Sequence, residues 1–392
     1  MKSEWNTSAI ANICKVVTDG SHTSPKSVSH GKYMVSVKDF TPYGFDFSGC
    51  RQISFADYEK LKSSGCVPQK GDILIGKDGA RYFEDIIIYN QDEAPALLSS
   101  IAILRCDEEK VIPEYLYYLL KTPSFKKDVK DNYGSGSAIP RIILKDFKRM
   151  KVEYPSIEKQ RQIVSILHDL DAKIFNNQKV NDNLEQQAAA LFSSLYNRSN
   201  TEVRYTDLIQ ILGGGTPKTG ETAYWNGNIA FFTPKDVGTP YTFITEKTIT
   251  EEGLSHCNSR LYPVNTVFVT ARGTVGKVGL SGVPMAMNQS CYALVGKETH
   301  QLLVYFYTLK VVDKLKHKAS GAVFDAITTR DFESEQIMKL SDDDARAFLC
   351  VAEPMFQDIL NNSIENLRLS TLRDFLLPKL MSGEIDVSNI QF

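Results

Sequence analysis

The chain has 392 residues, of which 42% are hydrophobic and 23% charged, and its formal net charge is −2. This composition is typical of a globular protein with room for two or three domains. No apolar run reaches the length of a membrane span, the N-terminal residues lack the apolar core of a signal peptide, and the seven cysteines include no C-x-x-C pair. These features exclude a membrane protein, a disulfide framework and a zinc ribbon, and they predict a cytoplasmic protein.

The net charge hides a local excess of basic residues. Residues 118–150 contain eight Lys and Arg against three Asp and Glu, whereas residues 336–392 contain five against nine. A nucleic-acid binder needs only one basic face, so the net charge neither forbids nor favours DNA as a partner.

In chain order, the first half shows a turn-rich opening, β-rich runs, an aromatic helix at 115–121 and a glycine-containing turn. The second half repeats this order. At a constant offset of 185 residues, GSGSAIPRIILKDF (134–147) aligns with ASGAVFDAITTRDF (319–332), and SIEKQRQIVSIL (156–167) with SDDDARAFLCVA (341–352). Earlier segments pair at drifting offsets: VPQKGDILIGKDGA (67–80) with YPVNTVFVTARGTV (262–275), SSIAIL (99–104) with QSCYAL (289–294), TSPK (23–26) with GTPK (215–218), and MVSVKDF (34–40) with FFTPKDV (231–237). A period this long predicts a domain duplication.

Each half ends in a long heptad-patterned helix. Predicted pairing positions are Leu167, Leu170, Ile174, Asn177, Asn181 and Leu184 in the first helix and Met355, Ile359, Asn362, Asn366 and Leu369 in the second. The asparagines lie in the middle of both helices, so antiparallel packing would bring them face to face and fix the register. The alternative is that each helix packs on its own domain and the asparagines are solvated.

The helix ends carry their own signals. Ser156 and Ser341 are candidate N-caps. Pro354 predicts a kink in the second helix or a later start. The predicted fold is therefore α+β: two similar mixed α/β domains, each followed by a long helix, with the helices forming an antiparallel coiled coil of pseudo-twofold symmetry. The predicted segments are 1–150 and 200–338 for the domains, and 151–199 and 339–392 for the helices.

No catalytic motif stands out. GGGTPKTG (213–220) looks like a phosphate-binding loop, but Pro217 occupies the position before Lys218 where a glycine N–H is needed. GSGSAI (134–139) lacks the third glycine of a dinucleotide loop, no Asn-Pro-Pro-aromatic methylation motif is present, and the six histidines show no metal-ligand spacing. Glu108 and Lys110 could hint at a nuclease, but they lie in a charged turn typical of solvated surface. We expect no catalytic residue, metal or cofactor in this chain.

Two similar domains on a rod of about 60 Å suit two sites about one DNA turn apart. Unlike domains would read an asymmetric, bipartite target. TDGSHTSPKSVSHGKYMVSVKDF (18–40), GGGTPKTGETAYWNGNIAFFTPKDV (213–237) and GSGSAIPRIILKDFKRMKVEYPSIEKQRQIVSIL (134–167) resemble segments of the specificity subunits of Type I restriction–modification systems. The resemblance covers essentially the whole chain, although LSDDDARAFLCVAEP (340–354) departs from the usual Pro-x-x-x-Gln wording of the second join.

The resemblance implies a non-catalytic subunit that binds double-stranded DNA, with a target-recognition domain in each half and helices that set the gap between the half-sites. It also implies two modification (methyltransferase) subunits, which hold S-adenosylmethionine and methylate adenine, and restriction (translocase and endonuclease) subunits, which use ATP and Mg²⁺. A fused enzyme and a peptide-binding scaffold are the alternatives. Salt-sensitive DNA binding would separate a DNA reader from a scaffold, and activity of the isolated chain would reveal an enzyme.

Basic, amide, hydroxyl and aromatic side chains in the loops are the candidate DNA contacts, because Lys and Arg neutralise phosphates and Arg, Asn and Gln can pair with base edges. The candidates are Lys26, Lys38, Lys77, Arg81, Ser135, Ser137 and Arg141 in the first half, and Lys218, Tyr224, Lys235, Arg272, Lys277, Asn288, Gln289, Ser320 and Arg330 in the second. Lys77 and Arg272 stand out because the repeat places a cation in both loops. The alternative for each lysine is an ordinary solvated surface position.

Overall fold

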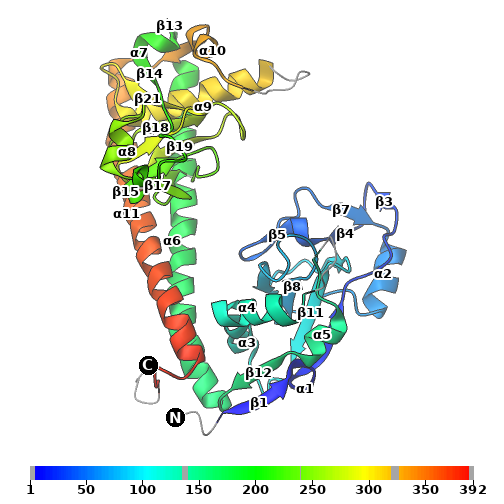
Figure 1. Ribbon diagram of the computed structural model, residues 1–392. Coiled ribbons are helices and arrows are strands. Elements are labelled where there is room, and N and C mark those ends of the chain that lie inside the picture. Colours follow the sequence, from blue (N-terminus) through cyan, green and yellow to red (C-terminus); the bar gives the residue numbers. More distant parts are fainter. Residues whose placement is uncertain (1–4, 135–139, 239, 319–325, 388–392) are drawn as a thin grey trace. The chain divides into compact units, whose positions relative to one another are not determined.

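A computed structural model describes residues 5–134, 140–238, 240–318 and 326–387. The chain forms two compact units, one made of Met1–Lys173 with Arg368–Phe392 and the other of Ile174–Leu367. The two long helices, α6 (Ile157–Arg198) and α11 (Asp342–Met381), each contribute one part to either unit. Figure 1 draws α6 and α11 side by side, and hydrogen bonds join the two helices within each unit.

The first domain, which precedes α6 in the chain, contains two small sheets. One has the order β2 (Cys14–Asp19), β11 (Ile101–Cys106), β8 (Ile73–Gly76) and β9 (Ile86–Ile88), and all its strands are antiparallel. The other has the order β10 (Ala96–Leu97), β4 (Lys32–Val35), β7 (Arg51–Ile53) and β3 (Ser27–Val28), with β10 and β4 parallel. The remaining elements before α6 are β1 (Asn6–Ala9), α1 (Ile10–Ile13), η1 (Val37–Asp39), β5 (Phe40–Thr41), β6 (Gly44–Phe45), α2 (Phe55–Ser63), α3 (Pro113–Lys121), α4 (Pro123–Asn132), α5 (Leu144–Arg149) and β12 (Lys151–Tyr154).

The second domain, which lies between α6 and α11 in the sequence, repeats this architecture. Its first sheet has the order β14 (Ile209–Gly213), β21 (Cys291–Gly296), β18 (Val267–Thr270), β19 (Val278–Ser281) and β16 (Tyr241–Thr242). Its second sheet has the order β17 (Lys247–Ile249), β15 (Trp225–Phe232) and β20 (Met285–Met287), with β15 and β20 parallel. The remaining elements are β13 (Thr201–Arg204), α7 (Tyr205–Leu208), η2 (Thr222–Tyr224), α8 (Glu251–Ser255), α9 (Gln301–Lys318), α10 (Thr329–Glu333) and β22 (Gln336–Lys339). The predicted duplication is thus confirmed at the level of sheet order.

Both domains are closed in the same way. The first strand of each pairs antiparallel with the strand that precedes the long helix, β1 with β12 and β13 with β22. The domains differ in the predicted aromatic helix, which is the single helix α9 in the second domain but is divided into α3 and α4 in the first. Pro123 explains the break, because the residue before a proline is disfavoured in helical conformation, and Thr122 caps the new helix by accepting from the Phe125 N–H at 3.3 Å.

The predicted alignment of Lys77 with Arg272 is wrong by one residue. Gly79 and Gly273 form the same left-handed turn after β8 and β18, with φ of +92° and +80°, and the strand pairing with β11 and β21 gives the same offset. The equivalent pairs are therefore Lys77 with Ala271, and Asp78 with Arg272. Because neighbouring residues of an extended segment point to opposite faces, the shift places Lys77 inside the domain and Arg272 outside it.

The antiparallel pairing of α6 and α11 is confirmed, and the predicted asparagines meet across it. Within the second unit, the Asn177 amide donates to Asn366 Oδ1 at 2.9 Å, and the Asn362 amide donates to Asn181 Oδ1 at 2.9 Å. Asn177 also donates to Glu365 at 2.7 Å. These hydrogen bonds satisfy the amides of Asn177 and Asn181, which are buried, and of Asn362 and Asn366, which are half-buried.

The remaining predicted seam positions are buried or half-buried. Ser156 and Ser341 are the expected N-caps and accept from the backbone N–H groups of Lys159 and Asp344 at 3.4 and 3.1 Å. Helix α11 begins at Asp342 and runs through Pro354, so of the two predicted effects of this proline, a kink or a later start, the later start is wrong.

Each domain shares its hydrophobic core with parts of both helices. In the first unit, Ile163 and Leu167 of α6 and Leu377 and Leu380 of α11 are buried with the aromatic face of α3. In the second unit, an aromatic cluster joins the helices to α9, with Phe192 and Phe348 both packed against Phe306. The described part of the chain contains no helix that is both long and apolar enough to cross a membrane.

Candidate nucleic-acid interface

Each of the two domains has an exposed lysine on the same kind of capped turn. In the first domain, Asp39 accepts from the backbone N–H of Ser36 at 2.7 Å and from its hydroxyl at 3.1 Å, and Lys38 lies exposed inside this turn. Such reciprocal capping fixes the backbone and therefore the direction in which the lysine leaves it.

The second domain repeats the turn at the equivalent position after β15. Asp236 accepts from the Thr233 N–H at 2.7 Å and from its hydroxyl at 2.6 Å, and Lys235 is 78% exposed. The match of MVSVKDF with FFTPKDV thus describes a shared three-dimensional feature. Sequence reasoning singled out the lysines but missed the capping aspartates, which the Ser/Thr-x-x-Asp spacing would have indicated.

The loop that follows β8 in the first domain and the loop that follows β18 in the second each lie against this capped turn. In the first domain, Lys38 and Arg81 line an open groove of about 470 Å³ together with Val37, Phe40, Gly79 and neighbouring residues. Arg81 is 75% exposed and pairs with Asp85 at 2.7 Å. In the second domain, the Thr274 hydroxyl donates to the Pro234 carbonyl at 2.9 Å. The loop therefore meets the capped turn in each domain, and in the first domain this brings Lys38 and Arg81 to one edge, as a phosphate-binding surface requires.

A third segment joins this edge in both domains. Asp78 forms an isolated antiparallel bridge with Arg141, and Arg272 forms one with Ala326. Arg141, Arg272, Lys277 and Arg330 are exposed. The candidates Ser135, Ser137 and Ser320 lie outside the described residues.

Lys77 lies beneath this edge. Its side chain is 8% exposed, with Nζ 3.4 Å from Asp19 Oδ2 and 3.6 Å from Asp78 Oδ1. Its N–H donates to the Ser100 carbonyl at 2.9 Å, and its carbonyl accepts from the Ile142 N–H at 3.0 Å. A contact between Lys77 and DNA stays a prediction, and the buried ion pairs oppose it because the ammonium faces two carboxylates.

The other candidates lie in or near the first loop segments of the two domains. Lys26 and Lys218 are exposed in the segments before β3 and η2. Tyr224 is half-buried and stacks on His256 with ring centroids 4.9 Å apart. Gln289 is exposed and accepts from the Thr216 hydroxyl, whereas Asn288 is half-buried and accepts from the Ser290 N–H at 3.0 Å.

Arg51 is a positioning residue that sequence reasoning missed. Its guanidinium donates to the Pro25 carbonyl and to the Ser24 hydroxyl, both at 2.7 Å. These bonds anchor the segment immediately before Lys26. No local pattern marks Arg51, because it lies on β7 far along the chain.

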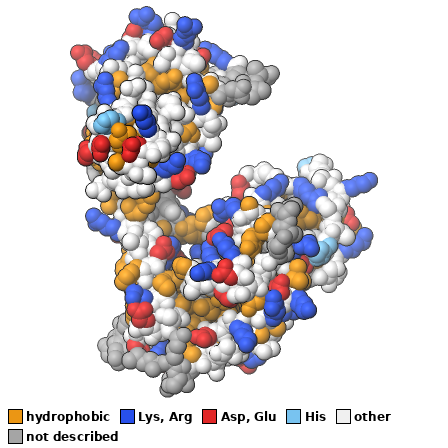
Figure 2. Space-filling model, viewed as in Figure 1, with side chains coloured by type: hydrophobic (Ala, Val, Ile, Leu, Met, Phe, Trp, Pro, Cys, Tyr) orange, Lys and Arg blue, Asp and Glu red, His pale blue; other side chains and the backbone are white. Residues whose placement is uncertain are grey.

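Several basic residues elsewhere in the first domain are paired with carboxylates. Lys126 and Lys130 of α4 both pair with Glu84, at 2.7 and 2.6 Å. Burial acts to raise the pKa of Glu84, but the hydrogen bonds from the two lysines hold it below its ordinary value. On the face drawn in Figure 2, Lys and Arg side chains are likewise interspersed with Asp and Glu in each unit. The local excess of positive charge at 118–150 is thus not one uninterrupted patch.

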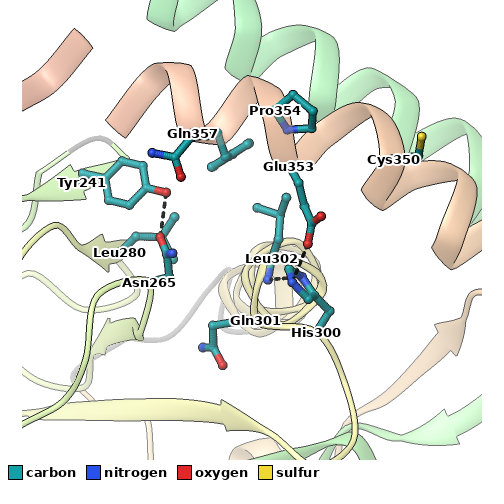
Figure 3. Close-up of a pocket in the computed structure, with 11 residues that line it drawn as sticks. Tyr241, Asn265, Leu280, His300, Gln301, Leu302, Cys350, Glu353, Pro354 and Gln357 are labelled. Carbon is teal, nitrogen blue, oxygen red and sulfur yellow. Dashed lines mark hydrogen bonds and ion pairs between the residues drawn. The ribbon is translucent and has the colours of Figure 1, made fainter. Parts of the chain in front are cut away.

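A pocket of about 440 Å³ lies in the second unit between α11 and the second domain (Figure 3). His300 approaches Glu353 to 2.6 Å at one side, and the Tyr241 hydroxyl donates to Asn265 Oδ1 at 2.8 Å at the other. No candidate DNA contact is among its lining residues, so we assign its polar pairs to the junction between domain and helix. The described residues include no cluster of three or more His, Cys, Asp or Glu that could hold a metal ion.

Two mixed α/β domains of one topology, each with a cationic edge and both packed on one antiparallel helix pair, define a duplicated recognition protein. A family model described as the Type I restriction modification DNA specificity domain matches residues 2–186 and 197–339. The chain belongs to this family.

Relatives with the same organisation support this placement. The Type I restriction enzyme MjaIX specificity subunit of Methanocaldococcus jannaschii is 25% identical over 310 residues, which cover 72% of this chain and 71% of that one. The HindI specificity subunit of Haemophilus influenzae is 24% identical over an alignment of 406 positions, which covers 81% of this chain and 87% of that one. The crystal structure of a Type I S subunit from M. genitalium matches 97% of both chains with a TM-score of 0.59 and 15% identity, which shows a shared fold.

Proposed function

We propose that this chain is the DNA sequence-specificity subunit of a Type I restriction–modification complex. Each recognition domain reads one part of a bipartite site, and α6 and α11 set the gap and dock the modification subunits. The observation that carries the proposal is the duplication itself: two domains of one sheet order, each with a capped lysine turn beside the loop that follows its central strand.

The site is asymmetric because the two edges carry different side chains. Where the first domain has the Lys77–Asp19 ion pair, the second has Ala271 and, by strand pairing, Gly213. Asp78 of the first edge is replaced by the exposed Arg272 in the second. Since base readout depends on the donors and acceptors presented to the groove, these edges would select different sequences.

The chain performs no chemistry in this proposal. S-adenosylmethionine would be held by two modification subunits, which methylate adenine, whereas ATP and Mg²⁺ would be used by the restriction subunits. The absence of the corresponding sequence motifs supports this division of labour. A cytoplasmic location follows from the same proposal, because the target is DNA.

Mapping adenine methylation on a genome after co-expression with the cognate modification subunit tests the function. We expect a split motif with a fixed gap that disappears when this chain is omitted. An assembled complex that methylates no such motif would contradict the proposal, and the mapped motif would supply the DNA for the measurements below.

A further inference from the structure

The duplication creates a choice of helix partner. Because Asn177 and Asn181 of α6 correspond to Asn362 and Asn366 of α11, two copies of α6 from different molecules could pair antiparallel with the same asparagines opposed. The asparagine layer therefore fixes register but does not distinguish α6–α11 pairing from α6–α6 or α11–α11 pairing.

An ion pair in the first unit breaks this equivalence. Asp171 of α6 accepts from Arg373 Nη1 of α11 at 2.7 Å, and both side chains are 24% exposed. The second carboxylate oxygen of Asp171 accepts from the buried Tyr118 hydroxyl of α3 at 2.7 Å. Arg373 also donates to Asp374 at 2.8 Å. Although burial acts to lower the pKa of Arg373, its bonds to both carboxylates raise it.

The equivalent position in the second unit is apolar. At the 185-residue offset, Asp171 corresponds to Phe356 and Arg373 to Ala188. Phe356 is 3% exposed and Ala188 is 0% exposed, and both belong to one hydrophobic cluster. Pairing of α6 with α11 thus places charge against charge in one unit and apolar against apolar in the other.

Pairing of like helices would mix the two kinds of contact. Two copies of α6 would place each Asp171 opposite an Ala188, and two copies of α11 would place each Arg373 opposite a Phe356. In the first arrangement the Asp171 carboxylate loses the Arg373 guanidinium, and in the second the guanidinium loses the carboxylate, although both groups stay partly buried. Separating two partly buried charges costs more free energy than separating an exposed ion pair.

We infer that Asp171 and Arg373 direct α6 to α11 and exclude pairing of either helix with its copy in a second molecule. The pairing that these two residues prevent is therefore one between α6 or α11 and the same helix of a second copy of this chain. The consequence for recognition rests on the proposed function: α6–α6 pairing would join two first domains and produce a reader of a symmetric site, whereas α6–α11 pairing keeps the two different domains together.

Making the polar contact apolar tests the inference in the full-length chain. The double variant Asp171→Phe with Arg373→Ala copies the contact of the second unit, and Asp171→Leu with Arg373→Ala avoids overpacking if the larger ring prevents folding. Two differently tagged copies are co-expressed, purified through one tag, and measured by sedimentation velocity. We expect recovery of the second tag and a dimer dissociation constant lowered by about tenfold or more, as expected when an energetic penalty of this kind is removed.

The matched control replaces one acidic and one basic residue of the same two helices that lie away from the contact between them. Asp169→Leu with Arg368→Ala alters an exposed acid and an exposed base on the same two helices, so this variant and the unmodified chain are expected to recover no second tag. A folded apolar variant that stays as monomeric as the control, or an unmodified chain that already dimerises, would overturn the inference. The masses require no DNA, so a failure of methylation mapping would count against the proposed function alone.

Discussion

The lysines of the first recognition edge differ in burial, and we expect this difference to decide how each affects DNA binding. Lys38 is exposed, so Lys38→Ala should remove about one phosphate contact and lower the slope of log affinity against log salt by about 1. Lys77 is held between Asp19 and Asp78, so Lys77→Met should leave the slope unchanged while lowering the free energy of unfolding by about 3 kcal/mol.

Titration of each variant with DNA that contains the mapped site, at several salt concentrations, separates the two effects. Lys235→Ala serves as the matched variant in the second domain and should reduce the slope as Lys38→Ala does. A reduced slope for a stably folded Lys77→Met protein would show that Lys77 leaves its ion pairs to contact DNA.

Because the pKa of Glu185 on α6 is raised, we expect the free energy of unfolding to depend on pH. Burial raises the pKa of Glu185, although the Tyr305 hydroxyl donates to it at 2.9 Å. In the pH window between the ordinary glutamate pKa and the raised value, the folded chain binds more protons than the unfolded chain, so stability falls as pH rises through that window. Glu185→Gln tests this dependence, because it removes the cost of ionising a buried carboxyl and keeps an oxygen that can accept from Tyr305.

The variant should therefore be more stable than the parent at pH 7 and differ little from it at pH 4, as urea unfolding can measure. An equal gain at both pH values would contradict this.

At the scale of elements, the asparagine layer should show coupled energetics. Asn181→Ala and Asn362→Ala each leave one partly buried amide without its partner, and each should cost about 1–2 kcal/mol. Because the two residues bond one another, the double variant should cost less than the sum, with a coupling of about 1 kcal/mol. Urea unfolding of the four proteins completes the cycle. Additive losses would mean that solvent satisfies both amides.

The elements also show which features a sequence reveals. The helix seam was predictable because heptad spacing is a local property of each helix and both N-caps lie beside it. The alignment of Lys77 with Arg272 was not, because a shift of one residue leaves the β-rich pattern intact while exchanging the buried and exposed faces. The hydrogen bonds of β11 and β21 decide that register, and these strands lie more than twenty residues along the chain.

At the scale of the whole molecule, the proposed spacer role predicts that helix length controls the gap. One heptad inserted between Lys173 and Ile174 of α6, with a matching heptad between Leu369 and Ser370 of α11, adds about 10 Å to each helix and keeps the seam in phase. We expect the methylated motif to retain both half-sites with a gap longer by about three base pairs.

Methylation mapping provides the measurement, and insertion into one helix alone provides the control. A single insertion puts the asparagine layer and the Asp171–Arg373 pair, which lie on opposite sides of the insertion points, out of register with each other, so it should destabilise the helix pair and abolish the motif rather than lengthen the gap. An unchanged gap after the paired insertion would show that the helices do not set the spacing.

The duplication, the two long helices, their antiparallel seam and the resemblance to the family were predictable from the sequence, because repeats, heptads and motifs are properties of order along the chain. Tertiary structure alone decided which cations reach the surface: it buries Lys77 against Asp19, exposes Lys38 and Lys235 on capped turns, and brings Arg81 beside Lys38. The physical reason is that burial and ion pairing depend on side chains contributed by distant strands. The same reason explains why Asp171 and Arg373, 202 residues apart, emerged as a pair only in the folded chain.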